Sequence, residues 1–286
     1  MKFKKPYFWD LKKPNFLSDI LNFLTIIIRI NNFFLNFNKK NKSEKFKTIC
    51  IGNIYVGGTG KTPTTIELYK ILKKYNVNIS VGKKFYKSQV DEQTILSNKT
   101  DLITGINRKE IKNKAKIAGK ELIIFDDGLQ DKYLSYDLQF VCFDGKKWIG
   151  NGRLLPAGPL REELESIKKY DGIFLKDIND NNQEILDLIK SINPKIKIFK
   201  TKYVINNLKQ FNTSDKFLIF SGIGNPESFG SLLKKNNFNI LDEIVFPDHH
   251  NYSNKEIVNI INKAEENNAK IITTEKDYVK IPKEYS

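Results

Sequence analysis

The pattern of hydrophobic and polar positions beyond residue 46 alternates short apolar runs with longer amphipathic stretches. Apolar runs bounded by polar turns predict strands, and stretches with a helical period predict helices. The predicted strands cover residues 48–51, 77–81, 122–125, 138–143, 172–175, 196–202, 217–220, 240–246 and 270–273. The predicted helices cover residues 61–75, 108–119, 180–192, 226–235 and 253–266. Such alternation is typical of an α/β protein with a mostly parallel sheet and helices on both of its faces.

A segment rich in glycine and proline at residues 149–162 interrupts this alternation. The strands and helices beyond it predict a second, smaller α/β unit, with the boundary near 145–165 or near 205–215. We therefore expect three parts: an N-terminal apolar helix with a basic linker at 1–46, a larger α/β core at 47–210, and a C-terminal α/β unit at 211–286.

Residues 15–37 form a strongly apolar helical stretch that Asp19 and Arg29 interrupt. It falls short of the roughly twenty apolar residues of a membrane-spanning helix, and no small-residue cleavage site marks it as a secretory signal. A helix lying in the membrane interface fits better, with lysines placed to meet anionic headgroups. The alternative is an ordinary helix packed on the domain. The flanking lysines are Lys2, Lys4, Lys5, Lys12, Lys13, Lys39, Lys40, Lys42, Lys45 and Lys47.

Composition adds a strong positive charge to this picture, because 48 Lys and Arg residues outnumber 33 Asp and Glu, for a formal charge of +15. Such a surface attracts phosphates, anionic lipid or nucleic acid. The chain has no basic stripe interleaved with aromatic residues and no known nucleic-acid motif, so nucleic acid is disfavoured. Cys50 and Cys142 each lie in an apolar strand-like run, which predicts buried thiols in the cytosol and no disulfide framework or zinc site.

A glycine-rich loop, Gly-Asn-Ile-Tyr-Val-Gly-Gly-Thr-Gly-Lys-Thr-Pro at 52–63, follows the first predicted strand and opens a helix. Its glycines allow backbone N–H groups to turn toward an anion, and the helix N-terminus adds a positive dipole end. The loop deviates from the Walker A pattern, because Tyr55 stands where that pattern has its first glycine. The alternative is a tight turn with an incidental Lys-Thr pair. The predicted nucleotide-binding residues are Gly57, Gly58, Thr59, Gly60, Lys61 and Thr62.

Two carboxylates, Asp126 and Asp127, follow the buried strand predicted at 122–125. In a nucleotide-binding sheet an acid at this position holds Mg²⁺ beside the phosphate loop, together with the hydroxyl of Thr62. The Asp-Asp-Gly sequence could also form a plain turn. Next to the phosphate loop, the metal-binding interpretation is favoured.

Further polar groups follow other predicted strands. The two histidines of the chain, His249 and His250, are adjacent in a loop where a proton carrier could reach a substrate. Asp91 and Glu92 follow the second strand, a pair that by itself is more typical of a solvated loop. The loops at 221–227 and 273–277 directly follow two more predicted strands. Ligands of open α/β sheets collect at the carboxyl ends of the strands.

Six motifs in this order resemble the tetraacyldisaccharide 4'-kinases, the lipid A 4'-kinase family of Gram-negative bacteria, along nearly the whole chain. They are GNIYVGGTGKTP at 52–63, DDGLQ at 126–130, GNGRLLPAGPLRE at 150–162, GIGNPESF at 222–229, FPDHH at 246–250 and TTEKD at 273–277. The resemblance implies a P-loop NTPase-like kinase core at 47–210, with 211–286 completing the active site. It implies transfer of the γ-phosphoryl group of ATP, with Mg²⁺, to the 4'-hydroxyl of a tetraacylated glucosamine disaccharide 1-phosphate. The expected location is the cytoplasmic face of the inner membrane, on an anionic surface, with no nucleic acid and no obligate protein partner.

The resemblance also implies roles for single residues. Asp91 would be the general base, assisted by His249, and Lys61 and Asp127 would be further catalytic residues. The implied metal ligands are Thr62, Asp126, Asp127 and Glu162, and the implied substrate-binding residues are Gln130, Arg161 and Asn151.

The chain departs from the family pattern at two places near the predicted site. Asp131 stands where the family has a histidine after Asp-Asp-Gly-x-Gln, and residues 81–86 lack the arginine of the family's Ser-Arg-Gly-Tyr stretch. A P-loop ATPase that drives assembly is the main alternative function, and a nucleic-acid-binding module is a weaker one. Neither gives the segments at 150–162 and 246–250 a role.

Overall fold

The computed structural model describes residues 5–35, 45–131, 133–177 and 182–285. The chain divides into two compact units, which we call the first unit (residues 1–85 and 99–202) and the second unit (residues 86–98 and 203–286). Residues 86–98 therefore group with the C-terminal part of the chain, and the N-terminal segment groups with the larger sheet. Lys2, Lys4, Lys39, Lys40, Lys42 and the expected helix start at 180 lie outside the described residues.

The first unit is built on a seven-stranded sheet in the order β3-β2-β4-β1-β5-β6-β7, and every neighbouring pair is parallel. Strand β3 was not predicted, because its four residues, Leu-Ile-Thr-Gly, form too short an apolar run to give a clear signal. The other six strands match predicted ones within two or three residues. The strands are β1 (Lys47–Gly52), β2 (Ile79–Lys84), β3 (Leu102–Gly105), β4 (Leu122–Asp126), β5 (Leu138–Asp144), β6 (Gly172–Lys176) and β7 (Lys197–Thr201).

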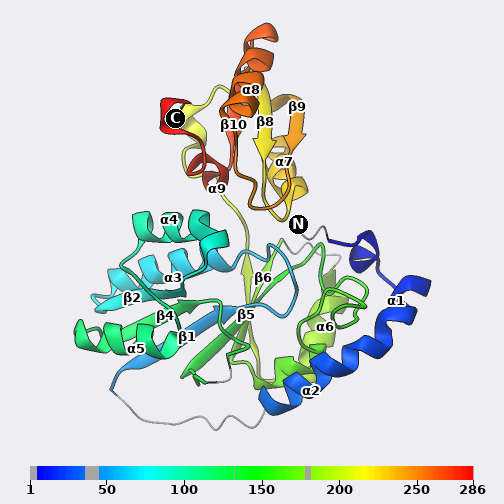
Figure 1. Cartoon of the computed structure of the whole chain (residues 1–286), viewed down its shortest axis with the longest axis vertical. Helices are drawn as coiled ribbons and strands as arrows, with labels where there is room; N and C mark the ends of the chain where they lie inside the picture. Colours follow the sequence, from blue (N-terminus) through cyan, green and yellow to red (C-terminus); the bar gives the residue numbers. More distant parts are fainter. Residues whose placement is uncertain (1–4, 36–44, 132, 178–181, 286) are drawn as a thin grey trace. The chain divides into compact units, whose positions relative to one another are not determined.

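Helices cover both faces of this sheet, as Figure 1 shows for α3 and α5 beside β2. The helices are α3 (Lys61–Lys74), α5 (Arg108–Ile117) and α6 (Gln183–Ile192), with a 3₁₀ turn η4 at Leu164–Lys169. Cys50 and Phe125 pair across β1 and β4 and pack in the core under α5 and α6. The next pair in the register, Ile51 with Asp126, points to the opposite face, which α3 covers. Side chains alternate between the faces of a strand, so the register decides which face Asp126 reaches.

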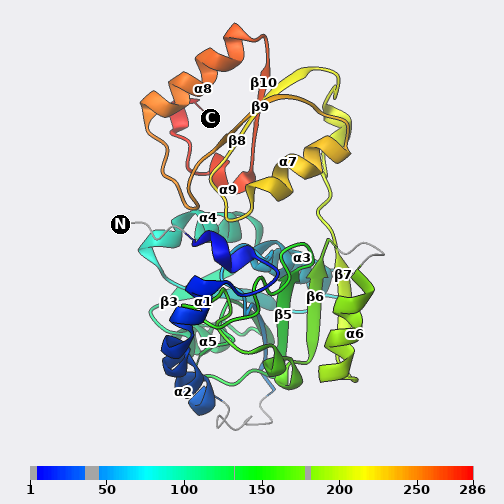
Figure 2. The same cartoon turned by 90° about the vertical axis from the view of Figure 1, so that its right-hand side faces the viewer.

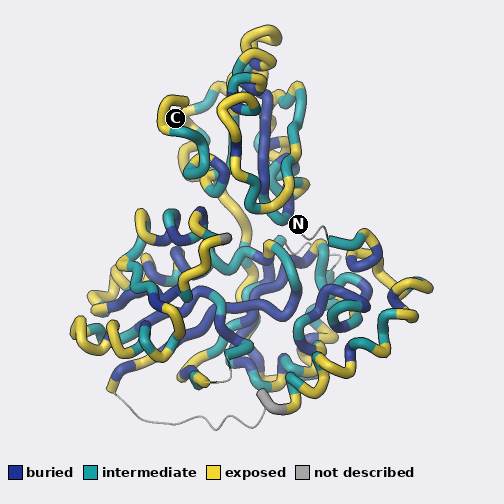
Figure 3. The backbone as a smooth tube through the Cα atoms, in the orientation of Figure 1, coloured by how far each residue is buried: buried dark blue, intermediate teal, exposed yellow. Residues whose placement is uncertain are grey.

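The N-terminal apolar stretch is divided into short pieces. It contains η1 (Tyr7–Asp10), α1 (Phe16–Leu21), the 3₁₀ turn η2 (Asn22–Leu24) and α2 (Thr25–Leu35). The single helix predicted at 15–37 is therefore interrupted at residue 22. Residues 16–33 are long and apolar enough for a membrane span, and 11% of this window is buried. Figure 3 shows this segment as largely exposed, in contrast to the buried central strands of the first unit.

The N-terminal segment is attached to the glycine-rich segment at 149–162 by buried hydrogen bonds. The Asn151 amide donates to the carbonyl oxygens of Phe8 and Ala157, at 3.2 and 3.0 Å, and to Ser18 Oγ at 3.2 Å. Ser18 Oγ donates to the Ala157 carbonyl at 2.7 Å, and Trp9 Nε1 donates to Pro156. Because Asn151 and Ser18 are both buried, these bonds fix the two segments to each other.

The second unit is a three-stranded parallel sheet in the order β10-β8-β9. Its apolar residues form two clusters: the α8 side contains Phe220 and Ile257, and the α7 side contains Ile219 and Leu233. Figure 2 shows α7 and α8 on opposite sides of this sheet. The elements are η3 (Lys87–Gln89), α4 (Val90–Lys99), η6 (Leu208–Gln210), β8 (Lys216–Ser221), α7 (Pro226–Lys235), β9 (Asn239–Val245), α8 (Asn254–Glu266), β10 (Lys270–Thr273), α9 (Glu275–Tyr278) and η7 (Lys283–Tyr285).

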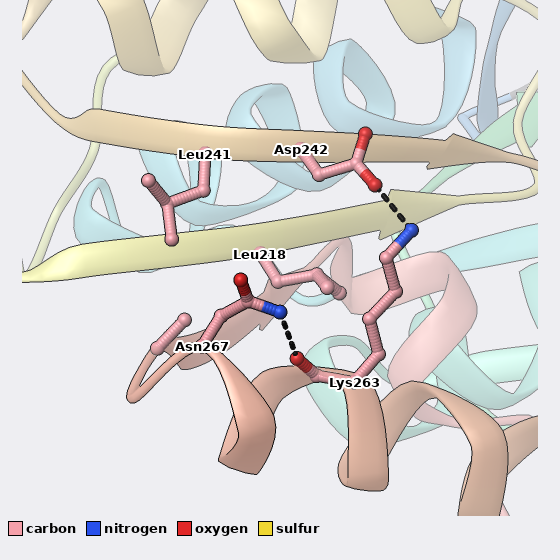
Figure 4. Close-up of a pocket in the computed structure, with 6 residues that line it drawn as sticks. Leu218, Leu241, Asp242, Lys263 and Asn267 are labelled. Carbon is pink, nitrogen blue, oxygen red and sulfur yellow. Dashed lines mark hydrogen bonds and ion pairs between the residues drawn. The ribbon is translucent and has the colours of Figure 1, made fainter.

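A small hollow in the second unit lies between β9 and the end of α8 (Figure 4). Its rim carries the ion pair of Lys263 with Asp242, at 2.5 Å. Leu218 lies near the amino end of β8, so the hollow is away from the carboxyl edge of the sheet, where ligands of parallel sheets collect. Its lining residues are Leu218, Leu241, Asp242, Lys263, Asn267 and Ala269.

Replacing Asn151 with alanine is expected to lower the free energy of unfolding of the first unit by roughly 2–4 kcal/mol, because buried acceptors lose their donor. Both tryptophans, Trp9 and Trp148, belong to this unit, so urea denaturation followed by their fluorescence measures the change. Asn113→Ala, on the exposed side of α5, is the matched control and is expected to change stability by less than about 0.5 kcal/mol. Equal effects of the two variants would contradict a structural role for Asn151.

Candidate active site

The glycine-rich loop leads from β1 into the first turn of α3. Gly60 takes a left-handed conformation, with φ of +87°, directly before the helix begins at Lys61. Glycine adopts this conformation without a steric penalty. The buried Thr59 Oγ has no hydrogen-bond partner among the described residues. A loop with an unsatisfied hydroxyl next to a free helix N-terminus fits an anionic ligand.

The carboxylate of Asp126 lies at the first turn of α3. Thr62 Oγ donates to Asp126 Oδ2 at 3.0 Å, and Lys83 Nζ pairs with the same oxygen at 2.8 Å. Lys83 and Asp126 are both buried, and a buried carboxylate is stable only when it is paired or hydrogen-bonded. Parallel pairing of β4 with β1 and β2 brings these side chains together from three separate segments.

Asp127 faces several cations at the same edge of the sheet. Its Oδ2 is 3.5 Å from Arg161 Nη1 and 3.8 Å from Lys61 Nζ. Burial by itself would raise the pKa of Asp127, but the charges of Lys61, Arg161, Lys83 and Arg108 outweigh it and hold the pKa below its usual value. Asp127 is therefore ionised at neutral pH.

Gln130, Arg161 and Glu162 lie next to this cluster. Gln130 Nε2 donates to Glu162 Oε1 at 2.7 Å, and Arg161 Nη1 lies 3.5 Å from Gln130 Oε1. The buried Glu162 carboxylate also accepts from Tyr170 Oη and pairs with Lys169 Nζ at 2.5 Å. Backbone bonds from Arg161 to Ile54 and from Val56 to Pro159 attach this segment to the phosphate loop. The two segments therefore form one part of the site.

Asn151 lies elsewhere in the first unit, under the N-terminal segment. Its amide nitrogen lies within 3.2 Å of three acceptors, which share its two hydrogens and give it a structural role. Its substrate-binding role stays a prediction.

The second unit brings Asp91 together with His249. Asp91 belongs to the first turn of α4, and its Oδ2 is 2.9 Å from His249 Nδ1. Burial would raise the pKa of Asp91, but the hydrogen bond with His249 and the charge of Lys276 outweigh it, so the pKa lies below its usual value. The predicted base is therefore ionised and in contact with its predicted partner.

Backbone geometry fixes His249 at the carboxyl end of β8. His249 has a φ of +57°, uncommon for a residue with a side chain, and its N–H lies 3.2 Å from the Gly222 carbonyl oxygen. His250 points to another partner, Glu256, at 3.0 Å, and stacks on Phe246. The two adjacent histidines therefore have different surroundings.

No group of three or more His, Cys, Asp and Glu side chains in the described part of the chain is arranged to hold a metal ion. Cys50 and Cys142 are free and buried, as predicted, and burial raises the pKa of Cys142 to about 12. The polar groups fall into two sets, one in each unit.

Comparison with known proteins identifies the family. The family model of the tetraacyldisaccharide-1-P 4'-kinases matches residues 17–286. The tetraacyldisaccharide 4'-kinase of Pelagibacter ubique is 45% identical over 281 residues, which cover 98% of this chain and 89% of that protein. This chain belongs to the tetraacyldisaccharide-1-P 4'-kinase family.

Other relatives agree with this assignment. The tetraacyldisaccharide 4'-kinase of Rickettsia akari is 33% identical over 298 residues, covering 98% of this chain and 89% of that protein. The solved structure of LpxK from Aquifex aeolicus, in complex with ATP, matches with a TM-score of 0.65 at 23% identity, covering 93% of this chain and 90% of that one. At this identity the likeness shows the fold. The resemblance, the P-loop kinase fold and the kinase class predicted from the sequence are confirmed.

Three cations in this kinase were missed by sequence reasoning, namely Lys83, Arg108 and Lys276. Lys83 lies in the stretch that lacks the family arginine, and its ammonium reaches Asp126. A signal was available, because a lysine inside an apolar strand next to the phosphate loop has to find a buried anion. Arg108 lies in ordinary charged helical sequence and gave no such signal. Lys276 belongs to the motif at 273–277, which the sequence placed at a strand end without assigning a role to the lysine.

Arg108 supports the turn that carries the two aspartates. Its Nε donates to the carbonyl oxygen of Asp127, and its Nη1 pairs with Asp131 Oδ2, both at 3.0 Å. Asp127 has a φ of +67°, so this turn is a strained one that needs support. Asp131, which replaces the family histidine, therefore has a defined partner in this kinase.

Arg108→Met is expected to lower the free energy of unfolding by about 3 kcal/mol, because the mostly buried Asp131 loses its partner. Adding Asp131→Leu is expected to recover part of that loss, since no unpaired charge remains. Thermal unfolding followed by circular dichroism measures both variants, with the exposed neighbour Lys109→Met as control. Additive losses in the double variant would show that the two charges do not interact.

Proposed function

We propose that this chain transfers the γ-phosphoryl group of ATP to the 4'-hydroxyl of a tetraacylated glucosamine disaccharide 1-phosphate, a step of lipid A biosynthesis. The observation that carries the proposal is the contact of Thr62 with Asp126 at the helix start after the phosphate loop, in a chain of this family. A phosphate loop whose hydroxyl lies beside a strand-end carboxylate is the arrangement that phosphoryl transfer requires.

In this proposal the loop from Gly57 to Thr62 holds the phosphates of ATP. Backbone amides of the loop and the α3 N-terminus donate to phosphate oxygens, and Lys61 adds a full charge. Lys61 Nζ is 3.8 Å from Asp127 Oδ2, which orients the ammonium before ATP binds. Arg161 and Gln130 would contact the anionic acceptor, since guanidinium groups bind phosphate in a bidentate manner. Residues 47–210 would form the kinase core, with 211–286 contributing the remaining catalytic groups.

Mg²⁺ fits the donors at this edge of the first unit, where Thr62, Asp126 and Asp127 supply oxygen atoms. Such sites commonly use one or two carboxylates, waters and substrate phosphates. When bound, Mg²⁺ neutralises charge on the phosphates of ATP. For Glu162, the fourth predicted ligand, Lys169 would have to release one carboxylate oxygen first.

Asp91 would accept the proton of the 4'-hydroxyl as that oxygen bonds to the γ-phosphorus and ADP leaves. Because the pKa of Asp91 lies below its usual value, the carboxylate is ionised but weakly basic. A weak base suffices, since the transition state is loose and the proton leaves late. His249 would hold the carboxylate in place.

Lys61→Ala is expected to lower kcat by about 10²–10³-fold, because charge stabilisation of the transferring group is lost. Asp91→Asn is expected to lower kcat with little change in KM for ATP, since it removes a proton acceptor and leaves the phosphate loop intact. Both are measured as transfer of labelled phosphate from ATP, with Mg²⁺, to the acylated disaccharide 1-phosphate in detergent micelles.

Lys70→Ala, exposed on the same helix as Lys61, is the matched control and is expected to keep full activity. Unchanged turnover in Lys61→Ala would refute the site assignment. Phosphate release that does not depend on the acceptor would favour the ATPase alternative.

We further propose that the exposed face of the N-terminal segment binds the anionic membrane surface on the cytoplasmic side of the inner membrane. Six large apolar side chains at positions 16–33, within the described part of this segment, are exposed by half or more, among them Phe23 at 70% and Ile27 at 65%. A lipid-linked acceptor requires that the enzyme reach the bilayer, and interfacial helices bind through such side chains. Ser18 and Trp9 hold the segment on the first unit, so binding would place that unit near the surface.

Replacing Phe23 and Ile27 together with asparagine is expected to weaken binding to anionic vesicles by tenfold or more, because each side chain contributes roughly 1.5 kcal/mol or more when inserted. Vesicle co-sedimentation measures the change. Ile106→Asn with Ile117→Asn removes two equally exposed apolar side chains elsewhere in the first unit and is expected to leave binding unchanged. Equal binding by both double variants would overturn the proposal.

A further inference from the structure

Lys276, on the short helix α9, lies at the centre of the polar cluster of the second unit. Its Nζ is 3.1 Å from Asp248 Oδ1, 3.2 Å from His249 Nε2 and 3.5 Å from Glu92 Oε1. Asp91 Oδ2 is slightly farther, at 3.8 Å. An ammonium has three N–H donors, so each of the three nearer acceptors can receive one.

Lys276 keeps its charge in these surroundings. Burial by itself would lower the pKa of Lys276, but Asp248, Glu92 and Asp91 outweigh it and raise the pKa. At neutral pH the side chain is therefore an ammonium, which donates hydrogen bonds and accepts none. Its partner atom on His249 has to be an acceptor.

The two contacts of His249 select one form of the ring. Nδ1 faces the Asp91 carboxylate at 2.9 and 3.1 Å, and a carboxylate only accepts. Nε2 faces the Lys276 ammonium, which only donates. Both contacts are satisfied when the proton is on Nδ1 and Nε2 is unprotonated. In the opposite tautomer, the lone pair of Nδ1 would face the lone pairs of the carboxylate, and the proton on Nε2 would face the protons of the ammonium.

We propose that Lys276 is a positioning residue that fixes His249 in the Nδ1–H tautomer and so leaves Asp91 as the group that takes the hydroxyl proton. This inference deepens the proposed function and rests on it. Because Nε2 of His249 accepts a hydrogen bond from Lys276, the imidazole cannot accept that proton. It donates to Asp91 instead, and the carboxylate keeps lone pairs for the substrate hydroxyl.

The chain around Lys276 holds it in place. Thr274 caps α9 by accepting from the Asp277 N–H, and its Oγ donates to the Asp277 carboxylate at 2.6 Å. Asp277 is fully buried and also accepts from Tyr252 Oη at 2.9 Å. These bonds attach the start of α9 to the core of the second unit. Within the Thr-Thr-Glu-Lys-Asp motif, Asp277 is therefore structural, and Lys276 is directed to His249.

The tautomer can be measured on the full chain without any substrate. The chain has two histidines, so selective ¹⁵N-histidine labelling gives two imidazole spin systems, and His249→Asn assigns them. We expect His249 of the wild type to be neutral with its proton on Nδ1 near pH 7. Lys276→Met is expected to abolish this single tautomer, and Lys276→Arg, which retains charge and donors, is expected to restore it.

Steady-state kinetics provide a second test of the role of Lys276. Near Asp91 the charged and titratable groups are Glu92 on α4, Asp248 and His249 on the loop after β9, and Lys276 on α9. Removing the positive charge of Lys276 raises the pKa of Asp91. Asp91 can accept the hydroxyl proton only when it is ionised. The fall of kcat/KM on the acid side is therefore expected to move to higher pH in Lys276→Met. We also expect kcat to decrease about tenfold with KM for ATP little changed.

Lys263→Met is the matched control, because Lys263 pairs with an aspartate in the same unit away from this cluster and is expected to change neither readout. An Nε2–H tautomer or an imidazolium in the wild type near pH 7 would overturn the inference. So would a Lys276→Met variant with an unchanged tautomer and pH profile. If the wild type phosphorylates no acceptor, the proposed function fails, and the tautomer measurement still decides the role of Lys276.

Discussion

Pairing of the buried Asp126 with Lys83 and Thr62 is the interaction on which the first unit depends. Asp126 has almost no exposed surface, and an unpaired carboxylate there would cost about 3–5 kcal/mol. Its partners come from β2 and α3, so the contact requires that β4 lie between β1 and β2. The strand order, the start of α3 and the position of the phosphate loop are thus coupled through one side chain.

The glycine-rich segment at 149–162 extends this coupling in two directions. At one end Asn151 holds the N-terminal segment, and at the other Arg161 and Glu162 contact the residues around Asp127 and Gln130. The same segment therefore joins the exposed apolar surface to the phosphate loop. In this kinase, the connection holds the glycine-rich loop and the proposed membrane contact in one compact unit.

The second unit also gathers polar side chains at the carboxyl edge of a parallel sheet, but their chemical composition differs. Gly222 follows β8, His249 lies in the loop after β9, and Lys276 lies in α9, directly after β10. Helix α4 adds Asp91. In the first unit the edge collects Lys61, Lys83 and Arg161 around two aspartates beside the glycine-rich loop. In the second it collects carboxylates around one histidine and one lysine, which suits control of a proton.

The sequence by itself determined the alternating α/β architecture, the glycine-rich loop and the two aspartates at the end of the fourth strand, because each depends on local pattern or on residues adjacent in the chain. It also predicted Asp91 and His249 as partners through the family resemblance, and the structure places their side chains in contact. The tertiary structure alone decided the rest. Lys83, Arg108 and Lys276 gain their partners from segments 19 or more residues away, and the grouping of residues 86–98 with the C-terminal unit depends on such contacts. The sequence shows that a lysine carries a positive charge, but it does not show where the side chain points. Only the packing of the chain decides which buried anion or imidazole the lysine contacts.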